Sequence, residues 1–131
     1  GTITPQLHAF IERLFFPFVV YDKKYSVIAP KRPETAVIYT MNVKEPVLTK
    51  DYIGEANNGP LGFFERYVTR VYKRPERICA FNTYQFSDYG KFVADGWDER
   101  EKAEWREREL PRELREAFEA GKRMAEKIKK G

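Results

Sequence analysis

The stretch that decides the fold runs from Ala36 to Arg77 and reads AVIYTMNVKEPVLTKDYIGEANNGPLGFFERYVTRVYKRPER. Its first half is rich in β-branched and aromatic residues and predicts two strands, Ala36–Val43 and Val47–Ile53, joined by a turn at Lys44-Glu45-Pro46. Its second half turns at an Asn-Asn-Gly-Pro run and then resumes a helical period. The stretch therefore predicts a β-hairpin followed by a helix.

That helix, expected over Leu61–Tyr72, is amphipathic with a basic outer face. Arg66, Arg70 and Arg74 recur every four residues, on the side opposite the apolar residues. Like charges at this spacing repel one another mildly unless an anion binds between them. An ordinary solvated face explains the pattern, and so does a ridge that contacts phosphates; both interpretations stay open.

Before this stretch, Thr4-Pro5 predicts a capped helix start, and Pro17 predicts the end of that helix. Phe18–Tyr21 and Tyr25–Ala29 predict a second hairpin. After the stretch, Arg77–Phe86 predicts a further strand.

The C-terminal part is charged and helical in pattern. A helix is expected from Trp97-Asp98 to about Glu109, and Pro111 is expected to open a last one. We therefore expect an α+β fold with a small antiparallel sheet, flanking helices and a long C-terminal helical segment. The expected organisation is a single domain over residues 1–110 and an amphipathic helix over 111–131.

Along the last helix, small and apolar residues alternate by four and three and form a narrow seam. Its members are Leu110, Leu114, Ala117, Gly121, Met124 and Ile128. Such a seam packs on another helix. It predicts docking of residues 110–128 on the chain's own domain, on a protein partner, or on a second copy.

Composition limits the function classes. The formal net charge of +4 permits an anionic partner without requiring one. The single cysteine, Cys79, cannot form an internal disulfide, so a cytoplasmic location is expected. No apolar run is long enough to span a membrane. The single histidine, His8, has no second histidine and no nearby cysteine to share a metal ion, so a metal role is not expected for it.

Two tyrosines and one arginine in the central stretch suggest chemistry. Tyr39 and Tyr52 fall near the ends of the two predicted strands, and Arg66 lies on the following helix. A phenol can relay a proton from an attacking water, and a guanidinium can bind a phosphate. The alternative is that both tyrosines are ordinary cross-strand aromatic partners.

The segments Val37-Ile38-Tyr39 and Tyr52-Ile53-Gly54, with Arg66 after them, resemble the GIY-YIG nuclease family, and small phage endonucleases in particular. The resemblance implies that Tyr39, Tyr52 and Arg66 are catalytic. It also implies that a glutamate of a later helix, Glu101 among several, holds Mg²⁺.

We therefore expect a nucleic-acid-binding protein, for DNA or RNA, and a metal-dependent endonuclease if the resemblance holds. The expected contacts to nucleic acid are Lys31, Arg32, Arg66, Arg70, Lys73 and Arg74. The alternative is a non-catalytic interaction protein, either phage-type or accessory, that docks a partner through its C-terminal helix.

Overall fold

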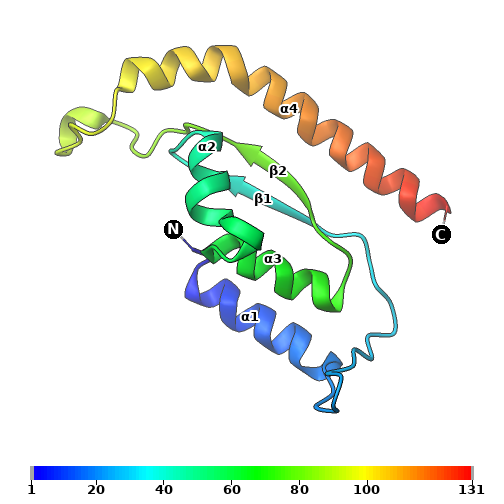
Figure 1. Ribbon diagram of the computed structural model, residues 1–131. Helices are drawn as coiled ribbons and strands as arrows, with labels where there is room; N and C mark the ends of the chain where they lie inside the picture. The colour runs from blue at the N-terminus through cyan, green and yellow to red at the C-terminus, as the bar shows by residue number, and fades with distance from the viewer. Residues whose placement is uncertain (1, 131) are drawn as a thin grey trace. The chain divides into compact units, whose positions relative to one another are not determined.

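A computed structural model describes residues 2–130, with the side chain of residue 130 left out, and the chain forms two compact units. Unit 1 comprises the residues up to 36 together with 46–76. Unit 2 comprises residues 37–45 and the residues from 77 onward. Figure 1 labels the helices and strands in chain order.

Unit 1 begins with helix α1, Pro5–Phe15, as the sequence predicted. The Thr4 hydroxyl oxygen accepts a hydrogen bond from the Leu7 backbone N–H at 3.3 Å and so caps the helix. A 3₁₀ turn, η1 (Phe16–Phe18), contains Pro17 and ends the helical segment.

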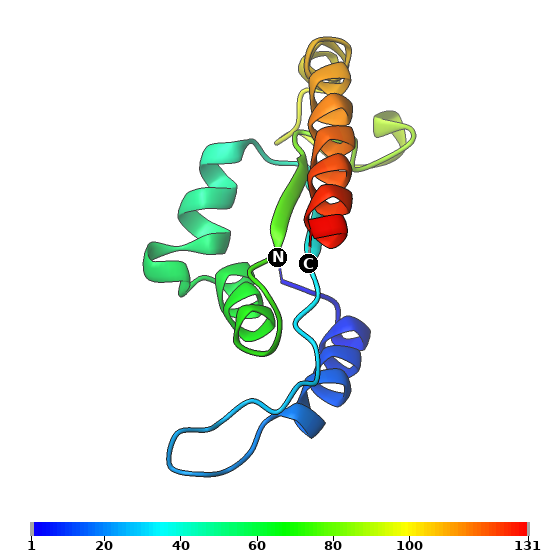
Figure 2. The same ribbon diagram turned by 90° about the vertical axis from the view of Figure 1, so that its right-hand side faces the viewer.

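The second predicted hairpin is present as a single antiparallel bridge between Val19 and Val27. Its loop extends from the end of α1 (Figure 2). The Asp22 carboxylate accepts hydrogen bonds from the backbone N–H groups of Lys24 (3.0 Å) and Ser26 (2.9 Å). The pKa of Asp22 is lowered, chiefly because the Ser26 hydroxyl also donates to this carboxylate. The turn is thus held by one side chain.

The predicted strand over Val47–Ile53 is wrong, because this segment is helical. It forms α2 (Glu45–Val47) and a π-helical turn, η2 (Leu48–Ile53). Leu48 and Ile53 are its buried residues, and their spacing of five places both on one side of a π-helical turn. Burial of these two side chains outweighs the strand preference of the sequence.

The chain then passes through a 3₁₀ turn, η3 (Glu55–Asn57). The segment after this turn packs against the backbone of η2 through its glycines. Gly54 has a φ of 71°, a conformation that favours glycine. A Cβ on Gly59 would lie 2.4 Å from the Tyr52 carbonyl oxygen, and one on Gly62 would lie 2.3 Å from that of Ile53. This close approach requires glycine at both positions.

Helix α3, Pro60–Val71, confirms the predicted amphipathic helix. Its apolar side is buried and includes Val68 at 5% and Val71 at 0% exposure. Phe15 of α1 packs edge-to-face against Tyr67 and Tyr72, with ring centroids 5.4 and 5.0 Å away. Helices α1 and α3 therefore share the core of unit 1.

The sheet has two strands, β1 (Ala36–Thr40) and β2 (Glu76–Ala80), and they run in the same direction (Figure 1). The Glu76 N–H donates to the Thr35 carbonyl at 2.9 Å, and the Met41 N–H donates to that of Ala80 at 3.0 Å. Residue numbers therefore rise together along both strands. The expected antiparallel pairing is wrong, because the segment after β1 is a helical crossover, which joins parallel strands.

Strand β2 is shorter than the predicted strand over Arg77–Phe86. A loop follows it and contains a 3₁₀ turn, η4 (Tyr89–Lys91). The rings of Phe86 and Phe92 stack at 4.2 Å between centroids, and Tyr89 packs edge-on against Phe86. This aromatic cluster holds the loop.

The last element, α4 (Glu99–Lys130), is one continuous helix rather than the two predicted ones (Figure 1). Pro111 lies inside it, so the domain boundary expected between residues 110 and 111 falls within the helix. Glu109 accepts from Arg112 at 3.0 Å and so bridges the proline position. The Phe81 backbone N–H donates to the Glu113 carboxylate at 3.1 Å and joins α4 to the end of β2.

The expected fold class is confirmed: a mixed helix-and-strand protein with a small sheet and a long C-terminal helix. No helix within residues 2–130 has the length and apolar character needed to cross a membrane.

Candidate functional site

The predicted basic ridge is present in unit 1, with Arg66 and Arg70 on α3 and Arg74 in the loop after the helix. Arg66, Arg70 and Arg74 are all exposed. They line an open depression of about 430 Å³. Its lining residues are Asn57, Glu65, Arg66, Thr69, Arg70 and Arg74. Glu65 is the carboxylate among them and is only 4% exposed, so the ridge presents mainly positive charge to solvent.

The Arg66 guanidinium is held by neutral groups. It donates through Nη1 to the Asn58 side-chain oxygen and lies 5.8 Å from the centroid of the Phe63 ring. Neither partner carries a charge, so the positive charge of Arg66 remains available to an anion.

The Arg70 guanidinium is held in the same way. Its Nη2 donates to the Tyr25 carbonyl oxygen at 3.1 Å, and the group lies 5.5 Å from the centroid of the same tyrosine ring. The hairpin loop after α1 therefore orients this arginine without neutralising it.

The other predicted nucleic-acid contacts are used differently. Arg32 donates to the carbonyl oxygens of Thr69 (3.0 Å) and Tyr72 (2.7 Å), which belong to the end of α3. Cations at this end of a helix satisfy its open carbonyl groups. Lys73 forms an ion pair with Glu34, which compensates its charge. Lys31 is exposed.

The three expected catalytic residues are divided between the two units. Tyr39 lies on β1 in unit 2. Tyr52 lies on the π-helical turn η2 and Arg66 lies on α3, both in unit 1. The expectation that the two tyrosines end adjacent strands is wrong, because Tyr52 lies on a helical turn.

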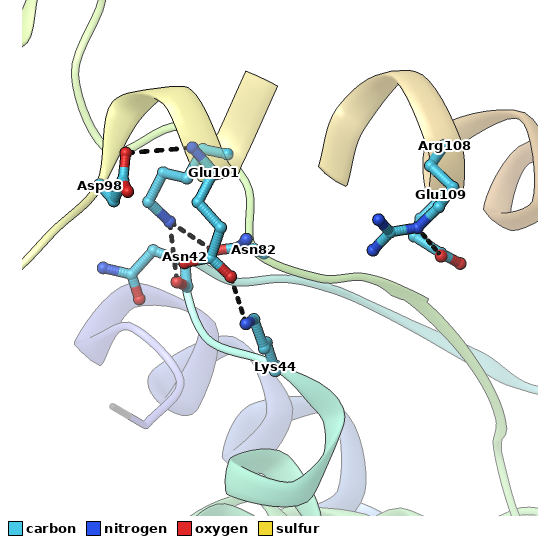
Figure 3. A network of polar contacts seen from close by, with 8 residues as sticks. Asn42, Lys44, Asn82, Asp98, Glu101, Arg108 and Glu109 are labelled. Carbon is cyan, nitrogen blue, oxygen red and sulfur yellow. Dashed lines mark hydrogen bonds and ion pairs between the residues drawn. The ribbon is translucent and has the colours of Figure 1, made fainter. Parts of the chain in front are cut away.

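The expected metal ligand, Glu101, lies on α4. Its carboxylate forms an ion pair with Lys44, and its backbone N–H donates to Asp98 (Figure 3). No group of three or more histidine, cysteine, aspartate or glutamate side chains in the described residues has metal-site geometry.

Next to Glu101 is a residue that sequence reasoning missed. Lys102 is 1% exposed. Its ammonium group donates to the Asn42 carbonyl (3.0 Å), the Asn82 side-chain oxygen (2.8 Å) and the Thr83 carbonyl (3.2 Å). Figure 3 shows the asparagines of this network close to Glu101. All three ammonium hydrogens are used, and the network joins α4 to the loops that follow both strands.

Burial lowers the pKa of Lys102 because the ammonium group loses its hydration. The Trp97 ring lies 4.8 Å from the ammonium nitrogen and faces the charge. No local signal in the sequence distinguishes Lys102 from the exposed lysines of the same helix.

The chain matches none of the known protein-family models, none of the curated proteins and none of the solved structures.

Proposed function

We propose that this protein binds nucleic acid through the ridge of Arg66, Arg70 and Arg74. The observation that carries the proposal is that Arg66 and Arg70 are oriented by neutral partners, so their charges are not compensated. Arg74 completes the same exposed row.

The spacing of the ridge suits a phosphate backbone. Arg66 and Arg70 are one turn apart on α3, which is a rise of about 6 Å, and Arg74 follows in the loop after the helix. One strand of duplex nucleic acid advances about 3.4 Å per phosphate along its axis, so the rise from Arg66 to Arg70 matches about two phosphate steps of a strand. Such contacts are independent of base sequence.

The salt dependence of binding tests the ridge. Fluorescence anisotropy with a labelled duplex DNA and a labelled RNA gives the slope of log binding constant against log salt concentration. Each of Arg66→Ala, Arg70→Ala and Arg74→Ala should reduce this slope by about one unit, because each removes one phosphate contact.

Arg100→Ala is the matched control. Arg100 is also exposed and helical, but it pairs with Glu104 at 3.0 Å. Its removal should leave the slope unchanged. Binding that does not vary with salt, or equal losses for ridge and control variants, would contradict the proposal.

Cleavage of the bound nucleic acid with Mg²⁺ is a finer form of this proposal, and it rests on the tyrosine motifs alone. Supercoiled plasmid incubated with the protein and Mg²⁺ should be nicked, and Tyr39→Phe, Tyr52→Phe and Glu101→Gln should each abolish nicking. Nicking that survives all three substitutions would remove these residues from the reaction, while the binding proposal would stand. We also propose that the protein is located in the cytoplasm.

A second function is favoured by the outer face of α4. Leu114, Phe118 and Ile128 are 62%, 72% and 68% exposed. One edge of this apolar stripe is flanked by cations, namely Arg115, Lys122 and Lys129. A second copy of the stripe packed antiparallel would bring these cations together, so the charges favour a different partner: a helix with an apolar seam and acidic flanks.

A synthetic heptad peptide with a leucine seam tests this second function. The peptide with glutamates beside the seam should bind more tightly than its counterpart with lysines there. Equal binding of both peptides would reject an acidic partner.

A further inference from the structure

A cavity in unit 2 gathers aromatic, charged and amide groups that the ridge does not use. It lies between the loop after β2 and helix α4, and its volume is about 260 Å³. Its lining residues are Phe81, Asn82, Thr83, Tyr84, Trp105, Arg106, Leu110 and Glu113. All of them belong to unit 2.

Two of the residues that line this cavity each carry a buried hydrogen-bond donor without a partner. They are the side-chain amide nitrogen of Asn82 and the indole nitrogen of Trp105. Within the described residues, no other buried side-chain nitrogen or oxygen atom lacks a hydrogen-bond partner. A buried donor without an acceptor costs free energy, so two of them at one cavity indicate a ligand with acceptor atoms.

The orientation of the Asn82 amide follows from its neighbour. Lys102 donates to the Asn82 side-chain oxygen at 2.8 Å, and an ammonium group has no acceptor atom. Turning the amide over would place two donors face to face. The NH₂ group of Asn82, which is 6% exposed, is therefore fixed as a donor on the side away from Lys102.

The cavity also offers an acceptor. The Glu113 carboxylate is 6% exposed and accepts one hydrogen bond, from the Phe81 backbone N–H. A carboxylate has room for further donors, so a ligand N–H group can bind there. The guanidinium of Arg106 lies 6.0 Å from the centroid of the Tyr84 ring, at the same cavity.

The geometry points to a binding site for a nucleobase-sized planar heterocycle. Such a ligand carries carbonyl oxygens for the Asn82 and Trp105 donors and a ring N–H for Glu113. Aromatic side chains of the lining can stack on its ring. A uracil ring, with its carbonyl, N–H and carbonyl edge, has this combination of groups. The inference does not depend on the arginine ridge, which belongs to unit 1.

NMR titration with uridine tests the site through the indole N–H signals. The chain has two tryptophans, and Trp97→Phe assigns their signals. Uridine should shift the Trp105 indole proton downfield, because that proton gains an acceptor, and should leave the Trp97 signal in place. 3-Methyluridine, which lacks the ring N–H, should bind several-fold more weakly because it cannot donate to Glu113.

Asn82→Asp isolates the donor. The new carboxylate still accepts from Lys102, so the fold keeps this contact, but it presents an acceptor to the ligand carbonyl. The variant should then bind uridine at least about tenfold more weakly than the wild-type protein, and its melting temperature should not fall. Gln6→Glu, at an exposed position of α1, makes the same change of charge in unit 1 and should leave uridine binding unchanged.

Three results would overturn the inference. One is a Trp105 signal that does not respond to millimolar uridine and shows only contact with water. A second is equal uridine binding by wild-type protein and Asn82→Asp. The third is equal binding of uridine and 3-methyluridine, which would remove Glu113 from the site.

Discussion

At the scale of single residues, Lys102 has the least common environment in the molecule. An ammonium group buried to 1% exposure normally faces a carboxylate, yet its three hydrogen bonds here go to neutral oxygens. The network contributes to stability only because every donor is satisfied.

Lys102→Met should therefore lower the free energy of unfolding by about 2–4 kcal/mol, because it leaves one buried and two partly buried oxygens without a donor. Urea denaturation followed by circular dichroism measures the change. Lys122→Met removes an exposed lysine of the same helix and should change stability by less than about 0.5 kcal/mol. Equal effects of the two substitutions would show that the network is not important for folding.

The same lysine predicts a pH dependence. Its pKa in the folded protein lies below the ordinary value of 10.5, so between these two values the unfolded chain binds more protons. Stability from this group should therefore rise as pH increases across that interval. The difference in unfolding free energy between wild-type protein and Lys102→Met, measured from neutral pH up to pH 10.5, should show this rise. A constant difference would mean that Lys102 titrates normally.

At the scale of elements, α4 is continuous although Pro111 lies inside it, so replacing this proline measures its cost to the helix. Proline lacks the N–H that would bond to the carbonyl four residues earlier, and a proline in a helix interior costs about 3 kcal/mol. Pro111→Ala should raise the unfolding free energy by about 1–3 kcal/mol in a thermal or urea melt. Ala125→Pro, on the exposed side of the same helix, should lower it by a similar amount. A loss of stability in Pro111→Ala would indicate that the proline stabilises α4.

Elements that depend on local signals could be predicted from the sequence. The hydroxyl cap at Thr4 and the apolar period of α3 both led to correct helices. The segment Val47–Ile53 could not, because its strand-prone residues fold as a helical turn through burial of Leu48 and Ile53. Pro46 in the first turn was the local signal that favoured a helix.

The candidate sites divide in the same way. Arg66 and Arg70 of the ridge were predictable because they recur at helical spacing on α3, whereas Arg74 lies in the loop after the helix. The Lys102 network was not, since its partners lie 60, 20 and 19 residues away in the sequence. The wrong strand pairing has one cause: a turn predicted at Lys44-Glu45-Pro46 is the start of a helix.

At the scale of the whole molecule, two neighbouring positions of α4 separate folding from association. Ala120 is 2% exposed and Phe118 is 72% exposed. Ala120→Glu should lower the unfolding free energy by about 3 kcal/mol, because it buries a charge. Phe118→Glu should leave stability within about 0.5 kcal/mol and abolish binding of the glutamate-flanked peptide. Retained binding in Phe118→Glu would exclude the outer face of α4 as a docking surface.

The division of the chain also bears on how the protein forms during synthesis. All the residues of unit 1 have been made once residue 76 is added, so this unit can fold while the rest is still being translated. Residues 37–45 must instead wait for residues from 77 onward, and Asn42 for Lys102. Until β2 is complete at Ala80, neither edge of β1 is paired, so slow translation before that residue would favour pairing of β1 with other chains.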